Sequence, residues 1–226
     1  MEGLRIAPDV QGAGLERALV NKVIETFSEI GIGLLRFATS GKDEALTKIV
    51  GEFGFRRIIS FKPMNAKVKE GDYRHFKLLQ LANLDMAHQY LRRSPMSRVN
   101  HFEENGGTFY YMTQERLHQF LSGTAVQVLA WREFDQVHGL AVIHLPEDGG
   151  TSQPMQIGMI DAPDDTTFTK MLGGMRGIAL KRNFADVSWM MPLSIGLERP
   201  VATTDLSPSW DGELWLFERP LMLPQT

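Results

Sequence analysis

The chain has 226 residues, a length that accommodates one large domain or two small ones. Its net charge of -3 disfavours a general nucleic-acid binder, and the absence of cysteine excludes disulfides, thiolate nucleophiles and cysteine-based metal sites. Neither a long apolar run nor a basic-then-apolar leader occurs, so we expect a cytoplasmic protein without a membrane span or secretion signal.

The first third of the chain alternates strand and helix patterns. Residues 4–7 predict a short strand, and apolar side chains from Leu15 to Ile30 recur at helical spacing. Two further strands are predicted at 34–38 and 55–61, with a shorter helix at 42–53 between them. This order implies right-handed crossovers and partly parallel pairing. The predicted fold class is therefore α/β with a mixed sheet.

The composition turns polar between residues 64 and 73, where we place a domain boundary. The predicted domains are residues 1–72 and 73–226. The second domain is expected to hold strands at 76–82, 125–134, 139–145, 156–160, 186–191 and 213–217, and helices at 84–91, 114–121 and 168–179. Residues 96–109 are predicted to form a loop. A strand–turn–helix–strand unit occurs in each domain, which suggests a duplicated architecture.

The turn after the first predicted strand holds the clearest candidate site. It consists of Gln11, Gly12, Ala13, Gly14, Leu15 and Glu16. A glycine-containing turn that opens a helix presents free N–H groups and the positive end of the helix dipole, which together bind phosphate. An ordinary strand-to-helix turn would also use these glycines. A dinucleotide fingerprint is the weaker interpretation, because the third glycine is replaced by Arg17 and no acid ends the next strand.

Three segments carry a resemblance to the Gcn5-related N-acetyltransferase family: the strand LRIAP, this turn and the later segment GKDEALTKIVGEFGFRR. The resemblance covers roughly the first 62 residues. The resemblance implies acetyl-CoA as co-substrate, with Gln11 to Glu16 binding its pyrophosphate. It also implies that Leu4, Arg5 and Ile6 orient the acetyl-pantetheine arm. The expected reaction is direct acetyl transfer to a small-molecule or peptide amine.

The second domain resembles a diverged copy of the same fold. The chain is thus predicted to contain tandem acyl-CoA N-acyltransferase-like domains, the first of which lacks its early strands. In the second domain, Asp161, Asp164 and Asp165 take the place of the turn glycines. Acids at a helix N-terminus stabilise the helix but repel a pyrophosphate. We therefore expect this copy to be a poor coenzyme A site.

Departures from the family pattern leave a second interpretation open. Glu16 stands where the family has glycine or alanine, and Asp43 stands where asparagine is common. The family's usual general acid is a tyrosine, and the matching position is Val50, which has no proton to donate. The alternative function is a non-catalytic acyl-CoA-binding or scaffold protein that retains the fold.

Other chemistry-bearing residues give weaker signals. Glu2 is a weak candidate base, and a solvated terminal residue is the favoured interpretation of it. Tyr73, Tyr110 and Tyr111 are unplaced candidate acids. The histidines lack metal-ligand spacing, so no metal is expected. An aromatic and methionine-rich group could be core packing or a ligand pocket; it comprises Trp189, Met190, Met191, Trp210, Trp215 and Phe217.

The predicted strand at residues 4–7 would have an unpaired edge if nothing precedes it. Three arrangements could cover that edge: further chain at the N-terminus, the second domain, or a second copy of the chain. We expect packing within the two-domain molecule together with a homodimer that covers residues 4–7. Nucleic acid and membrane partners are not expected.

Overall fold

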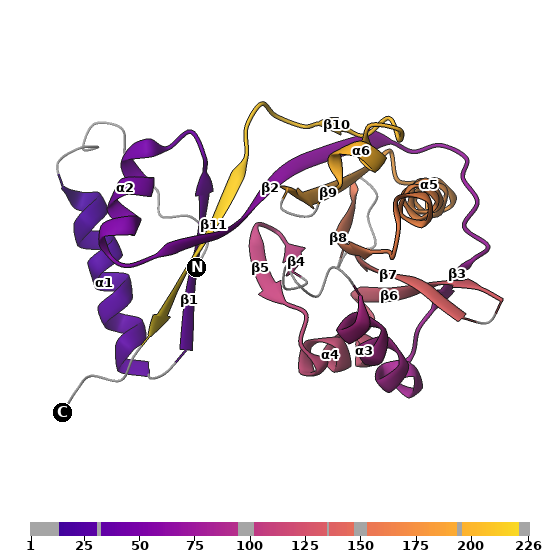
Figure 1. Ribbon diagram of the computed structural model, residues 1–226, viewed down its shortest axis with the longest axis horizontal. Coiled ribbons are helices and arrows are strands. Elements are labelled where there is room, and N and C mark those ends of the chain that lie inside the picture. Colours follow the sequence, from indigo (N-terminus) through magenta and orange to yellow (C-terminus); the bar gives the residue numbers. More distant parts are fainter. Residues whose placement is uncertain are drawn as a thin grey trace. The chain divides into compact units, whose positions relative to one another are not determined.

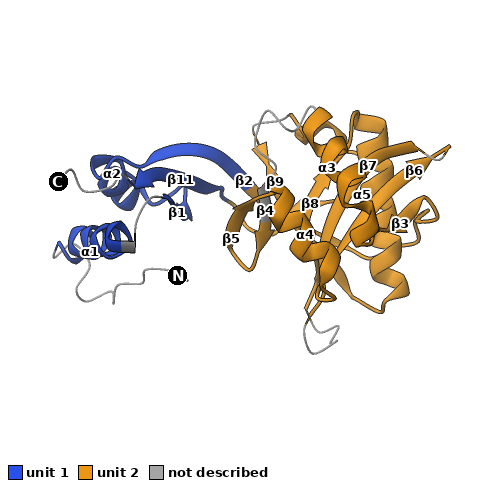
Figure 2. Ribbon diagram, turned by 90° about the horizontal axis from the view of Figure 1, so that it is seen from below, with its two compact units in different colours: residues 1–61, 212–226 blue, residues 62–211 orange. Residues whose placement is uncertain are grey.

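The computed structural model describes residues 14–30, 33–94, 102–134, 136–146, 153–193 and 196–221. Contacts divide the chain into two compact units (Figure 2). Unit 1 comprises residues 1–61 and 212–226, and unit 2 comprises residues 62–211. The division thus falls at 61/62 rather than after residue 72, and the C-terminal segment groups with the N-terminal one.

Unit 1 is a small sheet with two helices. Its elements are α1 (Leu15–Ile30), β1 (Gly33–Ser40), α2 (Glu44–Glu52), the first half of β2 (Arg56–Lys67) and β11 (Leu214–Leu221). β11 lies between β1 and β2 and is antiparallel to both (Figure 1). The expectation of parallel pairing is therefore wrong for these described strands, because the C-terminal strand separates β1 from β2.

The core of unit 1 forms where α1 and α2 pack against this sheet. Val20 and Ile24 of α1, Val50 of α2 and Phe217 of β11 belong to one buried cluster. Leu15, at the start of the predicted apolar stripe of α1, is exposed. The helix is confirmed, but its buried face lies about one position away from that stripe.

Unit 2 is built on a larger mixed sheet. Its strand order is β2, β9 (Asp186–Pro192), β8 (Met155–Asp161), β7 (Gln136–His144), β6 (Val126–Glu133) and β3 (Phe76–Leu78), and the short β10 (Ser207–Pro208) also pairs with β2. β8 and β9 are parallel, whereas β3, β6, β7 and β8 pair antiparallel along the sheet. The mixed α/β class predicted from the sequence is confirmed.

Helices cover both faces of this sheet. One face packs against α5 (Asp165–Lys181), whose Phe168, Met171 and Met175 are buried in the larger core. The other face packs against α3 (Leu84–Arg93) and α4 (Gln114–Ser122), which contribute Leu91 and Leu117 to a second core. A 3-10 turn (Leu81–Asn83) precedes α3, and the short α6 (Glu198–Val201) follows β9.

Two segments differ from the sequence prediction. The polar stretch expected to be a linker continues β2 to Lys67, and the expected loop at 96–109 contains the hairpin β4 (Phe102–Asn105) and β5 (Thr108–Tyr111). Glu104 stabilises this hairpin, because its Oε1 accepts the Gly107 N–H at 2.5 Å and its Oε2 accepts Gln156 Nε2–H on β8 at 2.6 Å. Neither segment has the strong alternation that marks a strand in sequence.

The two units share a succession of elements. Unit 1 runs α1, β1, α2, β2, and unit 2 runs α5, β9, α6, β10. In each case a strand from elsewhere in the chain separates the two strands of the series: β11 between β1 and β2, and residues of β2 between β9 and β10. The two series therefore share the same order of element types.

Candidate functional site

The parallel strands of unit 2 pair over only part of their length. β8 and β9 pair from Met155–Val187 to Ile157–Trp189, although β8 continues to Asp161 and β9 to Pro192. The register between β7 and β8 skips Gly158, so β8 changes direction where its pairing with β9 stops. The ends of the two strands therefore diverge at the N-terminal end of α5.

The end of β8 is buried against α3. Asp161 is 0% exposed, and its Oδ1 accepts the Ser94 hydroxyl at 2.6 Å and the Tyr90 hydroxyl at 3.4 Å. Burial raises the pKa of Tyr90, and the negative charge of Asp161 raises it further, so this hydroxyl stays protonated. The C-terminal end of α3 thus packs directly on the diverging end of β8.

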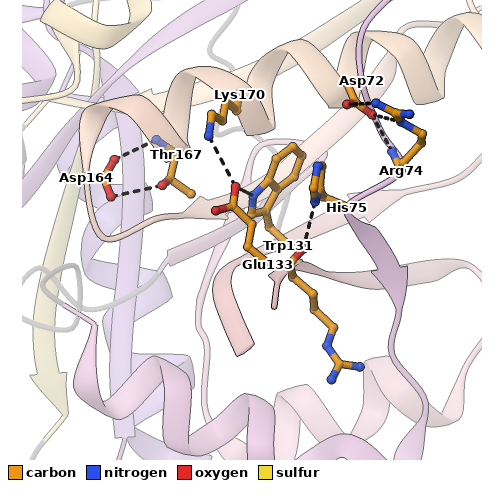
Figure 3. A network of polar contacts seen from close by, with 9 residues as sticks. Asp72, Arg74, His75, Trp131, Glu133, Asp164, Thr167 and Lys170 are labelled. Atoms are coloured by element: carbon orange, nitrogen blue, oxygen red, sulfur yellow. Dashed lines mark hydrogen bonds and ion pairs between the residues drawn. The ribbon is translucent and has the colours of Figure 1, made fainter. Parts of the chain in front are cut away.

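A carboxylate occupies the N-terminus of α5. Asp164 is the N-cap, and its Oδ1 accepts the Thr167 N–H at 2.8 Å while its Oδ2 accepts the Thr167 hydroxyl at 3.1 Å (Figure 3). The Thr167 N–H bond is the main cause of a lowered pKa at Asp164. Asp165 follows in the first turn. The α5 terminus, which would face a pyrophosphate, therefore already carries negative charge.

Further along α5, Lys170 contacts the sheet rather than a ligand. Lys170 Nζ lies 3.4 Å from Glu133 Oε1, which also accepts the Trp131 indole N–H at 3.1 Å (Figure 3). His75 stacks near Trp131, with ring centroids 4.9 Å apart. Glu133 has a lowered pKa because of the Trp131 hydrogen bond.

The N-terminus of α1 differs from that of α5. Gly14 precedes the helix with φ +83°, a conformation that favours glycine, and its Cβ position has open space around it. Leu15 is exposed, and Glu16 lies in the first turn. Glu2, Leu4, Arg5, Ile6, Gln11, Gly12 and Ala13 lie outside the described residues. The described part of the predicted turn therefore comprises Gly14, Leu15 and Glu16.

The residues that depart from the family pattern serve the fold. Val50 is buried in the unit 1 core. Asp43 caps α2, and its Oδ1 accepts the Leu46 N–H at 3.0 Å. The candidate acid Tyr73 lines a groove of about 730 Å³ beside the last turns of α5, and Tyr110 lies under the Arg116 guanidinium. Within unit 2, Tyr73 therefore lies beside the C-terminal end of α5 rather than at its start.

The predicted aromatic and methionine-rich group is not one cluster. Trp189 and Met191 lie in the larger core of unit 2, whereas Trp215 and Phe217 pack in unit 1. Core packing is thus confirmed for these four side chains, in two separate cores, whereas Trp210 is exposed. Among the described residues, His, Asp and Glu side chains form no group that could hold a metal ion. None of the described helices is long and apolar enough to span a membrane.

The sequence prediction missed two arrangements. Ser94 and Asp161 are distant in sequence, and a hydrogen bond of 2.6 Å joins them. Arg57 of β2 lies over the Trp215 ring of β11, with its Cζ 4.5 Å from the ring centroid. Both contacts depend on long-range pairing, so no local motif could have revealed them.

No protein-family model matches the sequence, and no curated protein matches it. Solved structures do. A GCN5-related N-acetyltransferase from Sphaerobacter thermophilus superposes with a TM-score of 0.66 at 10% identity, covering 96% of this chain and 71% of that one. An N-myristoyltransferase from Saccharomyces cerevisiae, solved with bound myristoyl-CoA and inhibitors, superposes with a TM-score of 0.64 at 8% identity, covering 99% of this chain and 60% of its own.

The chain has the GCN5-related N-acetyltransferase fold. A second such enzyme, from Anabaena variabilis, matches with a TM-score of 0.53 at 14% identity and covers 96% of this chain. This chain spans 53% of that protein. At these identities the likeness establishes the fold alone. The acetyltransferase and N-myristoyltransferase structures align with nearly the whole chain, so the alignments include residues of both units.

Proposed function

We propose that the chain is an acyl-CoA-dependent N-acyltransferase whose coenzyme A binds at the N-terminus of α1. In this proposal the chain is a tandem of two related halves, and unit 2 is the half that does not bind the co-substrate. The repeated succession of helices and strands, each with an inserted strand, supports this tandem. Acetyl-CoA is the expected donor, and the acceptor is a small-molecule or peptide amine.

The observation that carries the proposal is the contrast between the two equivalent helix ends. The α5 terminus is capped by the Asp164 carboxylate and buried against α3 through Asp161. The α1 terminus begins instead at Gly14, whose positive φ allows the backbone to turn without a side chain. A pyrophosphate needs free N–H groups and no nearby anion. The α1 end therefore offers free N–H groups more readily than the α5 end does. The proposal requires that the Glu16 side chain points away from the phosphates.

The proposed reaction transfers an acyl group by direct attack. The neutral amine nitrogen attacks the thioester carbonyl and forms the new carbon–nitrogen bond, and it loses one proton to solvent or to a side chain. The carbon–sulfur bond breaks, and the coenzyme A thiolate leaves and takes up a proton from solvent or from a side chain. Val50 cannot supply that proton. This buried apolar side chain favours a second candidate function, acyl-CoA binding without transfer. Both candidates require coenzyme A to bind, and only the first requires turnover.

Calorimetry with acetyl-CoA tests the binding site. Gly14→Asp should weaken binding by about tenfold or more, because it adds an anion beside the pyrophosphate. Gly14→Asn is the matched control, since asparagine tolerates the same backbone conformation and adds no charge. Asp165→Lys should leave the affinity unchanged. If Asp165→Lys tightens binding while Gly14→Asp has no effect, the site lies at α5 and the proposal is wrong.

Thiol release separates the two candidate functions. With acetyl-CoA and a panel of amines that includes peptide N-termini and polyamines, an N-acyltransferase should release free coenzyme A only when an acceptor is present. Binding without release across the panel would favour the non-catalytic function. Absence of binding at high micromolar acetyl-CoA would refute both.

A further inference from the structure

A groove of about 730 Å³ lies in unit 2 beside the last turns of α5. Residues 70–74, which follow β2, line one side, and Gly177, Leu180 and Lys181 of α5 line the other. α5 rises about 1.5 Å per residue, so the groove lies about 20 Å along the helix from the Asp164 cap. Small-molecule sites usually have volumes of about 300–1,000 Å³. The groove is therefore large enough for a small ligand and is separate from the N-terminal end of α5.

Close backbone contacts fix the two sides of this groove. A Cβ atom at Gly177 would lie 2.5 Å from the Gly71 carbonyl oxygen and 3.0 Å from Tyr73 Cδ1. A Cβ atom at Gly71 would in turn overlap the carbonyl oxygen of Gly173, one turn earlier on α5. The Tyr73 ring also packs against the larger core of unit 2. The groove is thus preformed, which reduces the ordering cost of binding a ligand.

Lys181 supplies a positive charge on the helix side of the groove. Its Nζ lies 5.4 Å from the centroid of the Tyr73 ring, and the residue is exposed. An ammonium group has three N–H donors, and contact with a ring leaves donors free for an anion. Leu180, which is 40% exposed, adds apolar surface beside it. This side of the groove therefore offers a cation that can bind a carboxylate, next to an apolar side chain.

Glu70 supplies a negative charge on the opposite side. Lys69, which precedes it, is paired with Asp205. Asp72, which follows, accepts the Arg74 backbone N–H at 3.1 Å and two guanidinium N–H groups at 3.0 and 2.8 Å (Figure 3). Glu70 is exposed and forms no ion pair within the part of the chain that the structure describes. Its carboxylate is therefore available to an ammonium group of a ligand.

We propose that this groove binds a small hydrophobic zwitterion, namely an amino acid or a short peptide with free ends. The ligand carboxylate contacts Lys181, its ammonium group contacts Glu70, and its side chain packs on Leu180. Such a ligand is neutral overall, and so is the lining, because the charges of Glu70 and Asp72 balance those of Arg74 and Lys181. The inference goes beyond the proposed function and does not rest on it.

Calorimetry of the full chain with L-leucine and with trileucine tests this site. Leucine carries both charges on one carbon, whereas trileucine separates them by about 10 Å, so the two probes distinguish an amino acid from a peptide. At least one of them should bind with a dissociation constant below about 1 mM. Its N-acetyl and amide derivatives each lack one charge, and each should bind at least about tenfold more weakly.

Two variants assign the charges to side chains. Lys181→Gln should lower the affinity for the zwitterion to that for the amide derivative, and Glu70→Gln should lower it to that for the N-acetyl derivative. Lys170→Gln is the matched control, because it removes the same charge from the same helix and its Nζ contacts Glu133 outside the groove. It should leave the affinity unchanged. Circular dichroism and urea midpoints equal to those of the unaltered chain establish that the variants fold.

Each outcome bears on the inference. Tighter binding of leucine identifies an amino acid site, and tighter binding of trileucine identifies a peptide site. Absence of binding of both probes at about 10 mM would overturn the proposal, as would equal affinities for the zwitterion and its derivatives. Unchanged affinity in Lys181→Gln and Glu70→Gln, or an equal loss in Lys170→Gln, would overturn the assignment to this groove. Because no arm contains coenzyme A, failure here and failure of the proposed function are separate results.

Discussion

Removing the Ser94 hydroxyl should destabilise unit 2, because Asp161 is completely buried. Ser94→Ala deletes the donor whose Oγ lies 2.6 Å from Asp161 Oδ1, which is the shorter of the two hydroxyl bonds to this oxygen; the other, from Tyr90, is 3.4 Å long. A hydrogen bond to a charged group contributes about 1.5–3 kcal/mol. For a chain of this size, that loss corresponds to a fall in melting temperature of about 3–12 °C.

Urea unfolding followed by tryptophan fluorescence measures this effect, since Trp131 and Trp189 are buried in unit 2. Ser122→Ala is the matched control: its hydroxyl donates to the His118 carbonyl on an exposed helix surface, so its loss should change stability by less than about 0.5 kcal/mol. Asp161→Asn completes a double-mutant cycle with Ser94→Ala, and a coupling energy of at least about 1 kcal/mol is expected. Zero coupling, or equal effects of Ser94→Ala and Ser122→Ala, would refute the reasoning.

Two further predictions concern α5. Gly177→Ala should destabilise the protein by about 1–3 kcal/mol, because the new Cβ would lie 2.5 Å from the Gly71 carbonyl oxygen. Gly173→Ala should instead stabilise the same helix by up to about 1 kcal/mol, because nothing lies within 4 Å of its Cβ position. Equal shifts in the urea midpoints of the two variants would contradict the close packing at Gly177. Asp164→Ala should cost about 1 kcal/mol at pH 7. Because the folded pKa of Asp164 is lowered, its contribution is full above the unfolded pKa near 3.9 and disappears as the pH falls through the folded pKa. A difference between the two proteins that persists in urea titrations at the lowest accessible pH would argue against the cap.

Much of the fold could be predicted from local patterns. α1, α4 and α5 were located closely because their apolar residues recur at helical spacing. The insertion of β11 between β1 and β2 could not be predicted in this way. It depends on pairing between residues at opposite ends of the chain, and nothing in either strand specifies its neighbour.

The candidate site was predictable only in part. Acids at the start of α5 could be read as caps, and Asp164 is one. The burial of Asp161 could not be anticipated, because its partners Ser94 and Tyr90 come from a helix more than sixty residues earlier. Likewise, Arg57 was noticed only within a family segment, and its stacking on Trp215 requires the long-range register of β11.

The position of β11 also constrains the order in which the chain can mature during synthesis. When a ribosome has released residues up to Lys67, β1 and β2 both exist, but the strand that separates them has not yet been made. The facing edges of β1 and β2 therefore stay unpaired until residues 214–221 are synthesised. Unpaired edges are sites of aggregation, and pairing of such remote segments is intrinsically slow. β11 thus completes the pairing of β1 and β2, so its synthesis determines how long their facing edges stay exposed to aggregation.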